Sequence, residues 1–165
     1  MLNLKSLTVI STPFPFALNL INNLNLEVLV IYFSNINFNL NLNQNLNLKT
    51  LALFQNYLTT LDVINNLNLE TLSVGLNNLT AIDISNNNQL VMIEISNNAL
   101  NGIDVTNNLL LKNINLYSNN ISNIDVSNNV LLESLRVVNN NLGSINLSNN
   151  LLLKRLDCYN NNIST

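Results

Sequence analysis

The sequence LETLSVGLNNLTAIDISNN at residues 69–87 contains one short pattern twice. Each half has apolar residues at its first, fourth and sixth positions and an asparagine at its ninth: Leu69, Leu72, Val74 and Asn77, then Leu79, Ile82, Ile84 and Asn87. Apolar residues that alternate over a short stretch predict a β-strand with one face turned inward. The segment therefore predicts two short strands separated by corners, and neither half has room for a long helix.

This double pattern recurs along the whole chain. Its opening residues are Leu4, Leu26, Leu48, Leu69, Leu90, Leu111, Leu132 and Leu153. The first two intervals are 22 residues (26 − 4 and 48 − 26), and the later ones are 21 (69 − 48). Repetition at such a period is typical of a solenoid, in which each turn packs on its neighbours. We predict one repeat domain over residues 1–165, nearly all β and loop, with stacked parallel strands and a partial last turn.

The repeated phrase LxxLxLxxNxL, followed by a half that ends in LxxN, resembles the leucine-rich-repeat superfamily. The similarity is to its nested 21-residue form, LxxLxLxxNxLxxLDLxxN, and it extends from Leu4 to the last residues. This form is typical of bacterial cell-surface and secreted proteins. The resemblance implies a leucine-rich-repeat solenoid, an extracellular or cell-surface location, and a protein or other macromolecular ligand that it does not identify.

Asparagine occupies the corners of the predicted turns, where Gly and Pro are scarce. A side-chain amide carries both a donor and an acceptor, so it can satisfy backbone groups that lose their partners where a strand ends. Asparagine also tolerates left-handed backbone conformations. We expect two structural ladders: a first column of Asn56, Asn77, Asn98, Asn119, Asn140 and Asn161, and a second column of Asn23, Asn45, Asn66, Asn87, Asn108, Asn129 and Asn150.

The composition excludes several classes of function. The chain has six basic residues and a net charge of −3, whereas nucleic-acid binding needs clustered Lys and Arg. It has no histidine, which excludes Ser-His-Asp and Cys-His catalysis, and no glycine-rich phosphate loop. No apolar run reaches the roughly 18 residues of a membrane span. We therefore expect a protein that is not an enzyme, needs no cofactor and does not cross a membrane.

One column of the repeat is the candidate binding face. It lies just past the second inward residue of each first strand and contains Tyr32, Phe54, Tyr117, Val138 and Tyr159. In leucine-rich-repeat proteins the equivalent positions face the concave binding surface, and aromatic residues are enriched at interfaces. The alternative is that these rings pack over neighbouring strands and shield the sheet.

Two further columns carry charge. Asp62, Asp83, Asp104 and Asp125 would stack in successive turns, where oxygen ligands could bind a divalent cation or could form a solvated acidic stripe. The signs alternate in the other column, which is broken only at Val91: Lys5, Glu27, Lys49, Glu70, Val91, Lys112, Glu133 and Lys154. Opposite charges in adjacent turns favour one stacking register.

A second function class stays open beside ligand binding. No recognisable capping unit covers either end of the predicted solenoid, so end-to-end self-association is an alternative. The corner leucines Leu110, Leu131 and Leu152 also predict an apolar ridge on the C-terminal half. A structural or adhesive surface protein would use such features.

Overall fold

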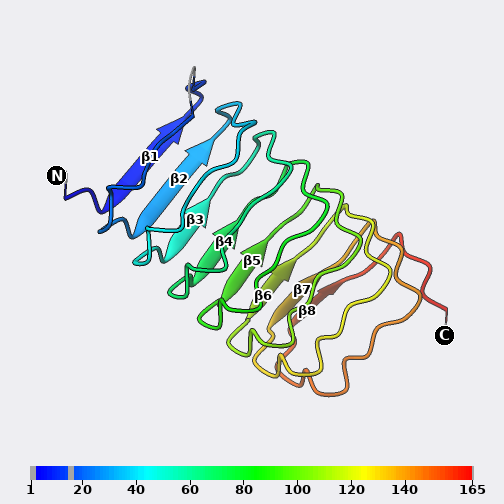
Figure 1. Cartoon of the computed structure of the whole chain (residues 1–165). Helices are drawn as coiled ribbons and strands as arrows, with labels where there is room; N and C mark the ends of the chain where they lie inside the picture. The colour runs from blue at the N-terminus through cyan, green and yellow to red at the C-terminus, as the bar shows by residue number, and fades with distance from the viewer. Residues whose placement is uncertain (1–2, 15–16, 165) are drawn as a thin grey trace.

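The computed structural model describes residues 3–14 and 17–164, so residues 1, 2, 15, 16 and 165 of the predicted domain lie outside it. Within these residues the elements are eight strands and no helix: β1 (Ser6–Ile10), β2 (Val28–Tyr32), β3 (Thr50–Ala52), β4 (Thr71–Ser73), β5 (Met92–Glu94), β6 (Asn113–Asn115), β7 (Ser134–Arg136) and β8 (Arg155–Asp157). They form one sheet in chain order (Figure 1). Every adjacent pair is parallel, as predicted.

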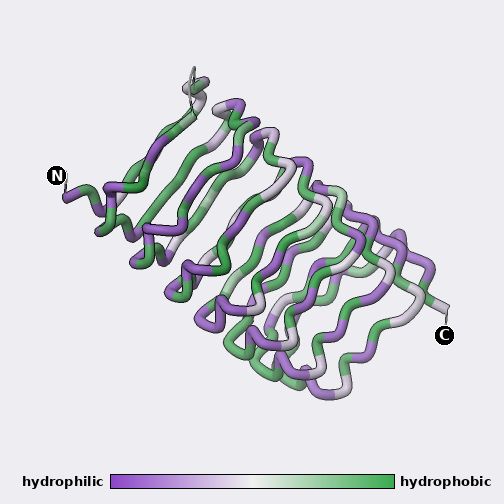
Figure 2. Tube along the Cα trace, in the orientation of Figure 1, coloured by the Kyte–Doolittle hydropathy of each residue, from purple (hydrophilic) through white to green (hydrophobic). Residues whose placement is uncertain are grey.

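The strand register follows the repeat. Ser6 pairs with Val28 across an interval of 22 residues, and Thr50 pairs with Thr71 across an interval of 21 (71 − 50). The longer first two turns therefore place their extra residue outside the strands. Hydrophobic and hydrophilic stretches consequently fall at matching places in successive turns (Figure 2).

Each turn contributes one strand, and the predicted second strand is not formed in the described residues. Most backbone groups in the second half do not reach the neighbouring turn: an interior turn there makes one such bond, for example from Asn78 N to Leu58 O at 2.8 Å. The rest of the second half closes on itself in tight turns, such as Asn87 N to Ile84 O at 3.0 Å. Alternating hydrophobicity predicts which side chains point inward, but it does not require a hydrogen-bonded ladder.

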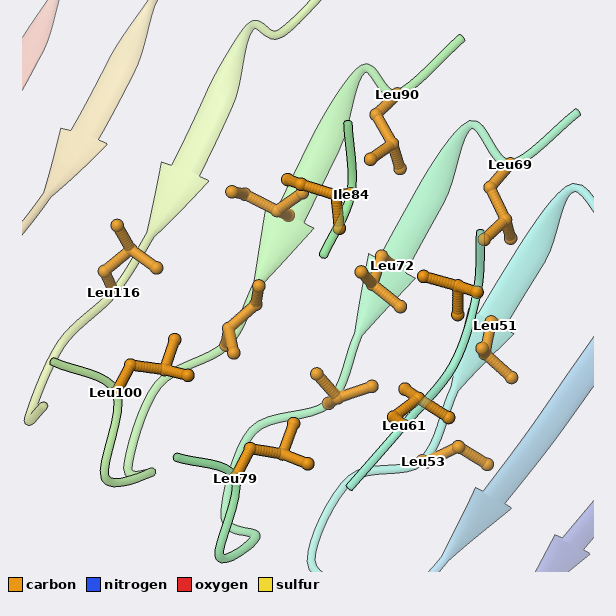
Figure 3. Packing of buried hydrophobic residues seen from close by; sticks show 14 of the residues in the cluster. Leu51, Leu53, Leu61, Leu69, Leu72, Leu79, Ile84, Leu90, Leu100 and Leu116 are labelled. Atoms are coloured by element: carbon orange, nitrogen blue, oxygen red, sulfur yellow. The ribbon is translucent and has the colours of Figure 1, made fainter. Parts of the chain in front are cut away.

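The core lies between the sheet and the second halves of the turns. Leu51 and Leu72 stack from the strands, and Ile84 lies on the opposite wall (Figure 3). Ile93 pairs with Leu72 in the next strand, and all four side chains are fully buried or nearly so. Burial of each such side chain contributes about 1.5–3 kcal/mol. Because every turn contacts only its neighbours, this stack extends continuously through the solenoid.

The first asparagine column forms the corner that follows each strand, which we call the first corner. Asn77 Oδ1 accepts from Leu58 N at 3.0 Å. Its Nδ2 donates to the carbonyls of Leu53, Val74 and Gly75 at 2.9–3.3 Å. The amide thus links two turns with both of its groups, as predicted for this ladder.

The second asparagine column forms the corner that closes each turn, which we call the second corner. Asn87 Nδ2 donates to Val63 O and Asn66 O, both at 2.9 Å. Its Oδ1 is buried without a hydrogen-bond partner, as are the same atoms of Asn45, Asn66, Asn108, Asn129 and Asn150. The expectation that both groups of each amide would be used is wrong at this corner, because the nearby backbone N–H groups already bond within the tight turns.

The left-handed backbone conformation occurs at the first corner, but not at the ladder asparagines themselves. The residue before each asparagine of the first ladder adopts it, with φ of 51–55° at Gln55, Leu76, Asn97, Ser118, Asn139 and Asn160. Phe33, which precedes Ser34 at the equivalent position, has a φ of 54°. The prediction that the corner asparagines adopt this conformation is therefore wrong by one residue. Bulky side chains rarely adopt a positive φ, so Phe33 and Leu76 are unusual here.

The alternating charge column forms ion pairs in part. Glu27 lies 3.1 Å from Lys5 Nζ and 3.6 Å from Lys49 Nζ, and Glu133 lies 2.6 Å from Lys154 Nζ. The bond from Lys5 lowers the pKa of Glu27, and the bond from Lys154 lowers the pKa of Glu133. Within the described part of the chain, Glu70 and Lys112 form no ion pair, so the predicted pairing is incomplete.

Candidate binding face on the strands

The parallel register aligns the outward side chains of the strands in rows. The residue between the two inward positions of each strand is, in successive turns, Thr8, Val30, Ala52, Ser73, Glu94, Asn115, Arg136 and Asp157. This row changes from uncharged side chains without an amide in the N-terminal half to charged and amide side chains in the C-terminal half. Since all its members sit on regular strands, the scaffold holds them at fixed positions.

The predicted aromatic column beside this row divides into two parts. The rings of Tyr32 and Phe54 meet edge to face, with centroids 6.0 Å apart, and Phe33 packs 6.4 Å from Tyr32 and 6.2 Å from Phe54. Tyr117 is half-buried, and Tyr159 is 64% exposed. The structure therefore brings Tyr32 and Phe54 together and leaves the other two tyrosines separate.

Val138 is fully buried, with 0% of its surface exposed. Its side chain is short, and tyrosines occupy the same position in the turns before and after it. The expectation that Val138 offers contact area on this face is therefore wrong, whereas Tyr32, Phe54, Tyr117 and Tyr159 all retain some exposed surface.

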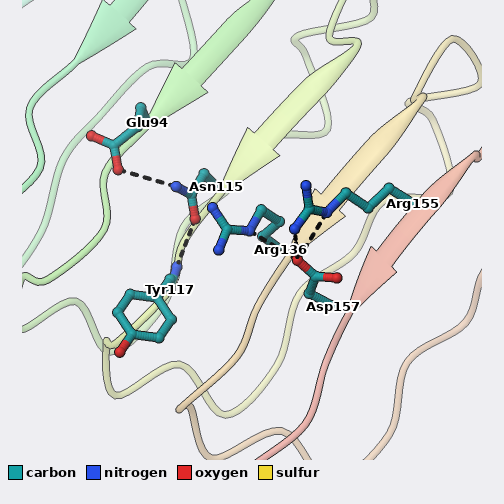
Figure 4. A network of polar contacts seen from close by, with 6 residues as sticks. All are labelled: Glu94, Asn115, Tyr117, Arg136, Arg155 and Asp157. Atoms are coloured by element: carbon teal, nitrogen blue, oxygen red, sulfur yellow. Dashed lines mark hydrogen bonds and ion pairs between the residues drawn. The ribbon is translucent and has the colours of Figure 1, made fainter.

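A polar network on the C-terminal strands was missed by the sequence reasoning (Figure 4). Asp157 Oδ2 accepts from Arg136 Nε at 3.0 Å and from the Nε and Nη2 of Arg155 at 3.0 and 2.7 Å. The bonds from Arg155 foremost, and from Arg136, lower the pKa of Asp157. Asn115 Nδ2 donates to Glu94 Oε1 at 3.2 Å. The sequence feature that could have indicated this network is the central outward position of each strand, where the residue type changes from turn to turn.

Gly75 explains why the aromatic column is interrupted in the middle of the stack. A Cβ at this position would lie 2.3 Å from Glu94 Oε2, so any side chain would displace the carboxylate. Glu94 lies over Gly75 and uses Oε1 to accept from Ser96 N at 3.2 Å. Its Oε2 is buried without a hydrogen-bond partner. The middle of the face is therefore acidic and close to the backbone.

A shallow hollow of about 340 Å³ lies on this part of the face. Its lining includes Met92, Glu94, Asn115, Ser134 and Arg136 from three neighbouring strands. It brings the apolar side chain of Met92 together with groups of both charges, Glu94 and Arg136, which suits recognition of a polar surface.

The aspartate column has a local structural role. Asp62, Asp83, Asp104 and Asp125 each accept a hydrogen bond from the backbone N–H two residues later, at 2.9–3.1 Å. Asn19, Asn41 and Asn146 make the same contact in other turns. Among residues 3–14 and 17–164, no cluster of three or more His, Cys, Asp or Glu side chains could hold a metal ion.

An apolar ridge does exist at the second corner, but its main line is one residue earlier than predicted. Its members are about half exposed or more and are interrupted by Asn88: Leu24, Leu46, Leu67, Leu109, Val130 and Leu151. Of the predicted residues, Leu110 and Leu152 are also exposed and Leu131 is half-buried. The ridge therefore extends into the N-terminal half as well.

The one parallel sheet, the leucine core and the asparagine corners define a leucine-rich-repeat solenoid. Among solved structures, the chain is similar to the functional domain of InlJ from Listeria monocytogenes, whose structure includes a cysteine ladder. The two are 34% identical with a TM-score of 0.92, and the match covers 96% of this chain and 35% of that one. These 165 residues contain one cysteine, Cys158, so they hold no such ladder of their own.

Two more distant structures share the fold. A leucine-rich-repeat protein of Leptospira interrogans is 24% identical with a TM-score of 0.85, and the match covers 96% of this chain and 44% of that one. Internalin C2 of Listeria monocytogenes is 22% identical with a TM-score of 0.63, over 68% of this chain and 52% of that one. No family model and no curated protein matches the sequence. None of the described residues form a helix capable of crossing a bilayer.

Proposed function

We propose that the chain is a non-catalytic module that acts at the cell surface or outside the cell. It binds a protein through the outward side of its sheet together with the adjacent aromatic column, which we call the strand face. The observation that carries the proposal is the sharp difference between constant corners and a variable face. The corners repeat asparagine in successive turns, whereas the central outward position of the strands, from Thr8 to Asp157, holds a different residue type in every turn. A scaffold that only held itself together would not need such varied chemistry on its flattest surface. The likeness to bacterial leucine-rich-repeat structures supports the scaffold. The nested 21-residue repeat, which is typical of bacterial cell-surface and secreted proteins, supports the binding function and the location.

The two halves of the face would contribute differently to binding. Tyr32 and Phe54 offer partly exposed rings that support one another, and such rigid rings lose little conformational entropy on binding. Arg136 uses only its Nε in the described structure, so its remaining guanidinium donors can pair with a partner's carboxylate or carbonyl. The chemistry of the face fits a folded protein partner with both apolar and acidic groups.

The test compares two matched fourfold variants of the intact chain. One carries Tyr32→Ser, Phe54→Ser, Tyr117→Ser and Tyr159→Ser on the face, and the other carries Leu46→Ser, Leu67→Ser, Leu109→Ser and Val130→Ser on the ridge. Each immobilised protein is exposed to extracellular protein extracts, and recovered proteins are quantified by mass spectrometry. We expect partners retained by the wild type to be lost from the face variant and kept by the ridge variant. Equal recovery by the folded face variant and the wild type would exclude this face.

The exposed ridge favours a second candidate function, self-association. Six aliphatic side chains in one line form the kind of apolar surface that marks association sites. Sedimentation of the wild type and the ridge variant tests this candidate. A wild-type monomer at micromolar concentration would exclude self-association, whereas an assembly that the ridge variant abolishes would support it.

A further inference from the structure

A groove of about 370 Å³ lies at the first corner of the second to fifth turns, beside the strand face and not on it. Its lining includes Phe33, Gln55 and Leu76, which precede the ladder position in their turns, and Asn35, Tyr57 and Asn78, which follow it. The ladder residues Asn56 and Asn77 also line it. The volume is at the lower end of the roughly 300–1,000 Å³ of small-ligand sites.

The groove is where the chain departs from its own corner pattern. In most turns the residue with left-handed backbone is polar: Gln55, Asn97, Asn139, Asn160, Ser11 and Ser118. The two apolar residues at this position, Phe33 and Leu76, both border the groove. These two bulky residues have φ of 54° and 53° while remaining 44% and 37% exposed. Their backbone strain is therefore not offset by full burial of their side chains. Strain retained in this way is typical of functional sites.

Tyr57 is the matching departure at the position that follows the ladder residue. Asparagine occupies this position at Asn35, Asn78, Asn120, Asn141 and Asn162, and proline and alanine occupy it at Pro13 and Ala99, whereas Tyr57 places an aromatic side chain there that is 56% exposed. Its backbone N–H bonds to Ile36 O at 2.8 Å, as in other turns, so the corner does not need the ring. The rings of Tyr32, the last residue of β2, and Phe54, two residues after β3, meet the Phe33 ring edge to face. Two partly exposed rings therefore border one groove.

The amides that line the groove differ in whether they already have hydrogen-bond partners. Asn56 Oδ1 accepts from Ser34 N and Ile36 N, and its Nδ2 donates to backbone carbonyls, so the ladder amide is fully used. In contrast, the side-chain amides of Asn35, Gln55 and Asn78 make no hydrogen bond to other described residues. Each offers a donor and an acceptor together, which matches a hydroxyl group that also donates and accepts.

No lining residue of the groove carries a charge. A charged ligand would gain no ion pair there, and a purely apolar one would leave the wall amides without partners. We propose that this groove binds a neutral oligosaccharide, whose rings pack their C–H faces on Phe33 and Tyr57 and whose hydroxyls bond to Asn35, Gln55 and Asn78. A proline-rich peptide would also use aromatic walls, but the amide content favours the sugar.

The test is an NMR titration of the intact, isotopically labelled chain with maltohexaose, cellohexaose and chitohexaose at millimolar concentration. We expect at least one of these neutral sugars to shift the backbone and side-chain amide signals of residues 33–35, 55–57 and 76–78. Tyr57→Asn restores the residue type of its column, so it should leave the unfolding temperature unchanged while weakening binding by about tenfold. Phe33→Asn, which suits the left-handed backbone, should weaken binding similarly.

Tyr159→Asn is the control, because it removes a tyrosine outside the groove that is 64% exposed, against 56% for Tyr57, and it should leave sugar binding unchanged. Three outcomes would overturn the proposal: no shift with any of the three sugars, shifts confined to other residues, or shifts at the groove with a proline-rich decapeptide alone. The groove lining contains none of the four residues changed in the face variant, so the titration tests sugar binding whether or not the face binds a protein.

Discussion

The two corners of each turn use the same residue type in different ways. At the first corner, Asn77 accepts from a backbone N–H of the previous turn and donates to three carbonyls. At the second corner, Asn87 only donates, and its oxygen is buried without a partner. Two asparagine columns that look equivalent in the sequence are therefore unequal in the structure. The first column joins turns through both the oxygen and the nitrogen of its side-chain amides. The second column only donates, to tight turns whose backbone N–H groups already have partners.

The largest expected effect is the loss of an amide at the first corner. In Asn77→Ala, the buried Leu58 N–H loses its only partner, and three carbonyls lose a donor. We expect destabilisation by roughly 3 to 5 kcal/mol, because buried unpaired groups carry their full desolvation cost. Equilibrium urea unfolding measures it.

The same substitution at the second corner should cost less. In Asn87→Ala, the carbonyls of Val63 and Asn66 keep backbone donors, at 2.9 and 3.1 Å, and the unpartnered oxygen is removed. We expect a loss of about 1–2 kcal/mol in the same urea experiment. Equal losses for Asn77→Ala and Asn87→Ala would show that the corners are equivalent.

Relief of strain at the first corner should stabilise the protein. Leu76→Asn places at φ 53° a residue type that adopts this conformation at Asn97 and Asn139. We expect a gain of about 0.5–1 kcal/mol, seen as a higher unfolding temperature. The reverse change, Asn97→Leu, should lower the unfolding temperature, and a fall in both variants would contradict the role of strain.

The smallest effect concerns the carboxylates that precede the second corner. The Ser85 N–H lowers the pKa of Asp83, the Thr106 hydroxyl and N–H lower that of Asp104, and the Ser127 hydroxyl and N–H lower that of Asp125. A carboxyl with a lowered folded-state pKa stabilises the fold above its ordinary value of 3.8. That contribution disappears as the pH falls through the lower folded-state value.

We therefore expect the unfolding temperature of the wild type to fall between pH 6 and pH 3. The triple variant Asp83→Asn, Asp104→Asn and Asp125→Asn should lose less, because asparagine accepts the same bond at Asn41 and Asn146. Its remaining pH dependence should come from Glu27, Glu133 and Asp157. Equal pH dependence in the two proteins would mean that these three bonds contribute nothing.

Repetition made much of this architecture predictable. A residue type that recurs every 21 positions must share an environment, so the leucine core, the strand positions and both asparagine columns follow from the spacing. The second strand was predicted wrongly because alternation reports burial and not backbone pairing. The left-handed residues were missed because they have no common side chain: Phe33, Gln55 and Leu76 share only a backbone conformation.

The candidate face was less predictable, because the sequence defines a column but not its exposure. Val138 is covered although its column contains exposed Tyr159. The network of Arg136, Arg155 and Asp157 depends on side-chain reach between turns, and the position of Glu94 depends on the open space at Gly75. Such contacts form between residues that occur in one turn only, so the repeat pattern does not predict them.

The alternating charge column has a consequence for changes in chain length. Its signs are opposite from Lys5 to Glu70 and again from Lys112 to Lys154, but the phase slips at Val91. Deletion of the 21 residues 91–111 would place Glu70 beside Lys112 and leave one unbroken alternation. Loss of the Glu27, Lys49 or Glu133 turn would set two like charges side by side, and loss of the Glu70 or Lys112 turn would leave Val91 as an uncharged gap in the column. The Val91 turn is thus the interior turn whose removal leaves neither a pair of like charges nor a gap.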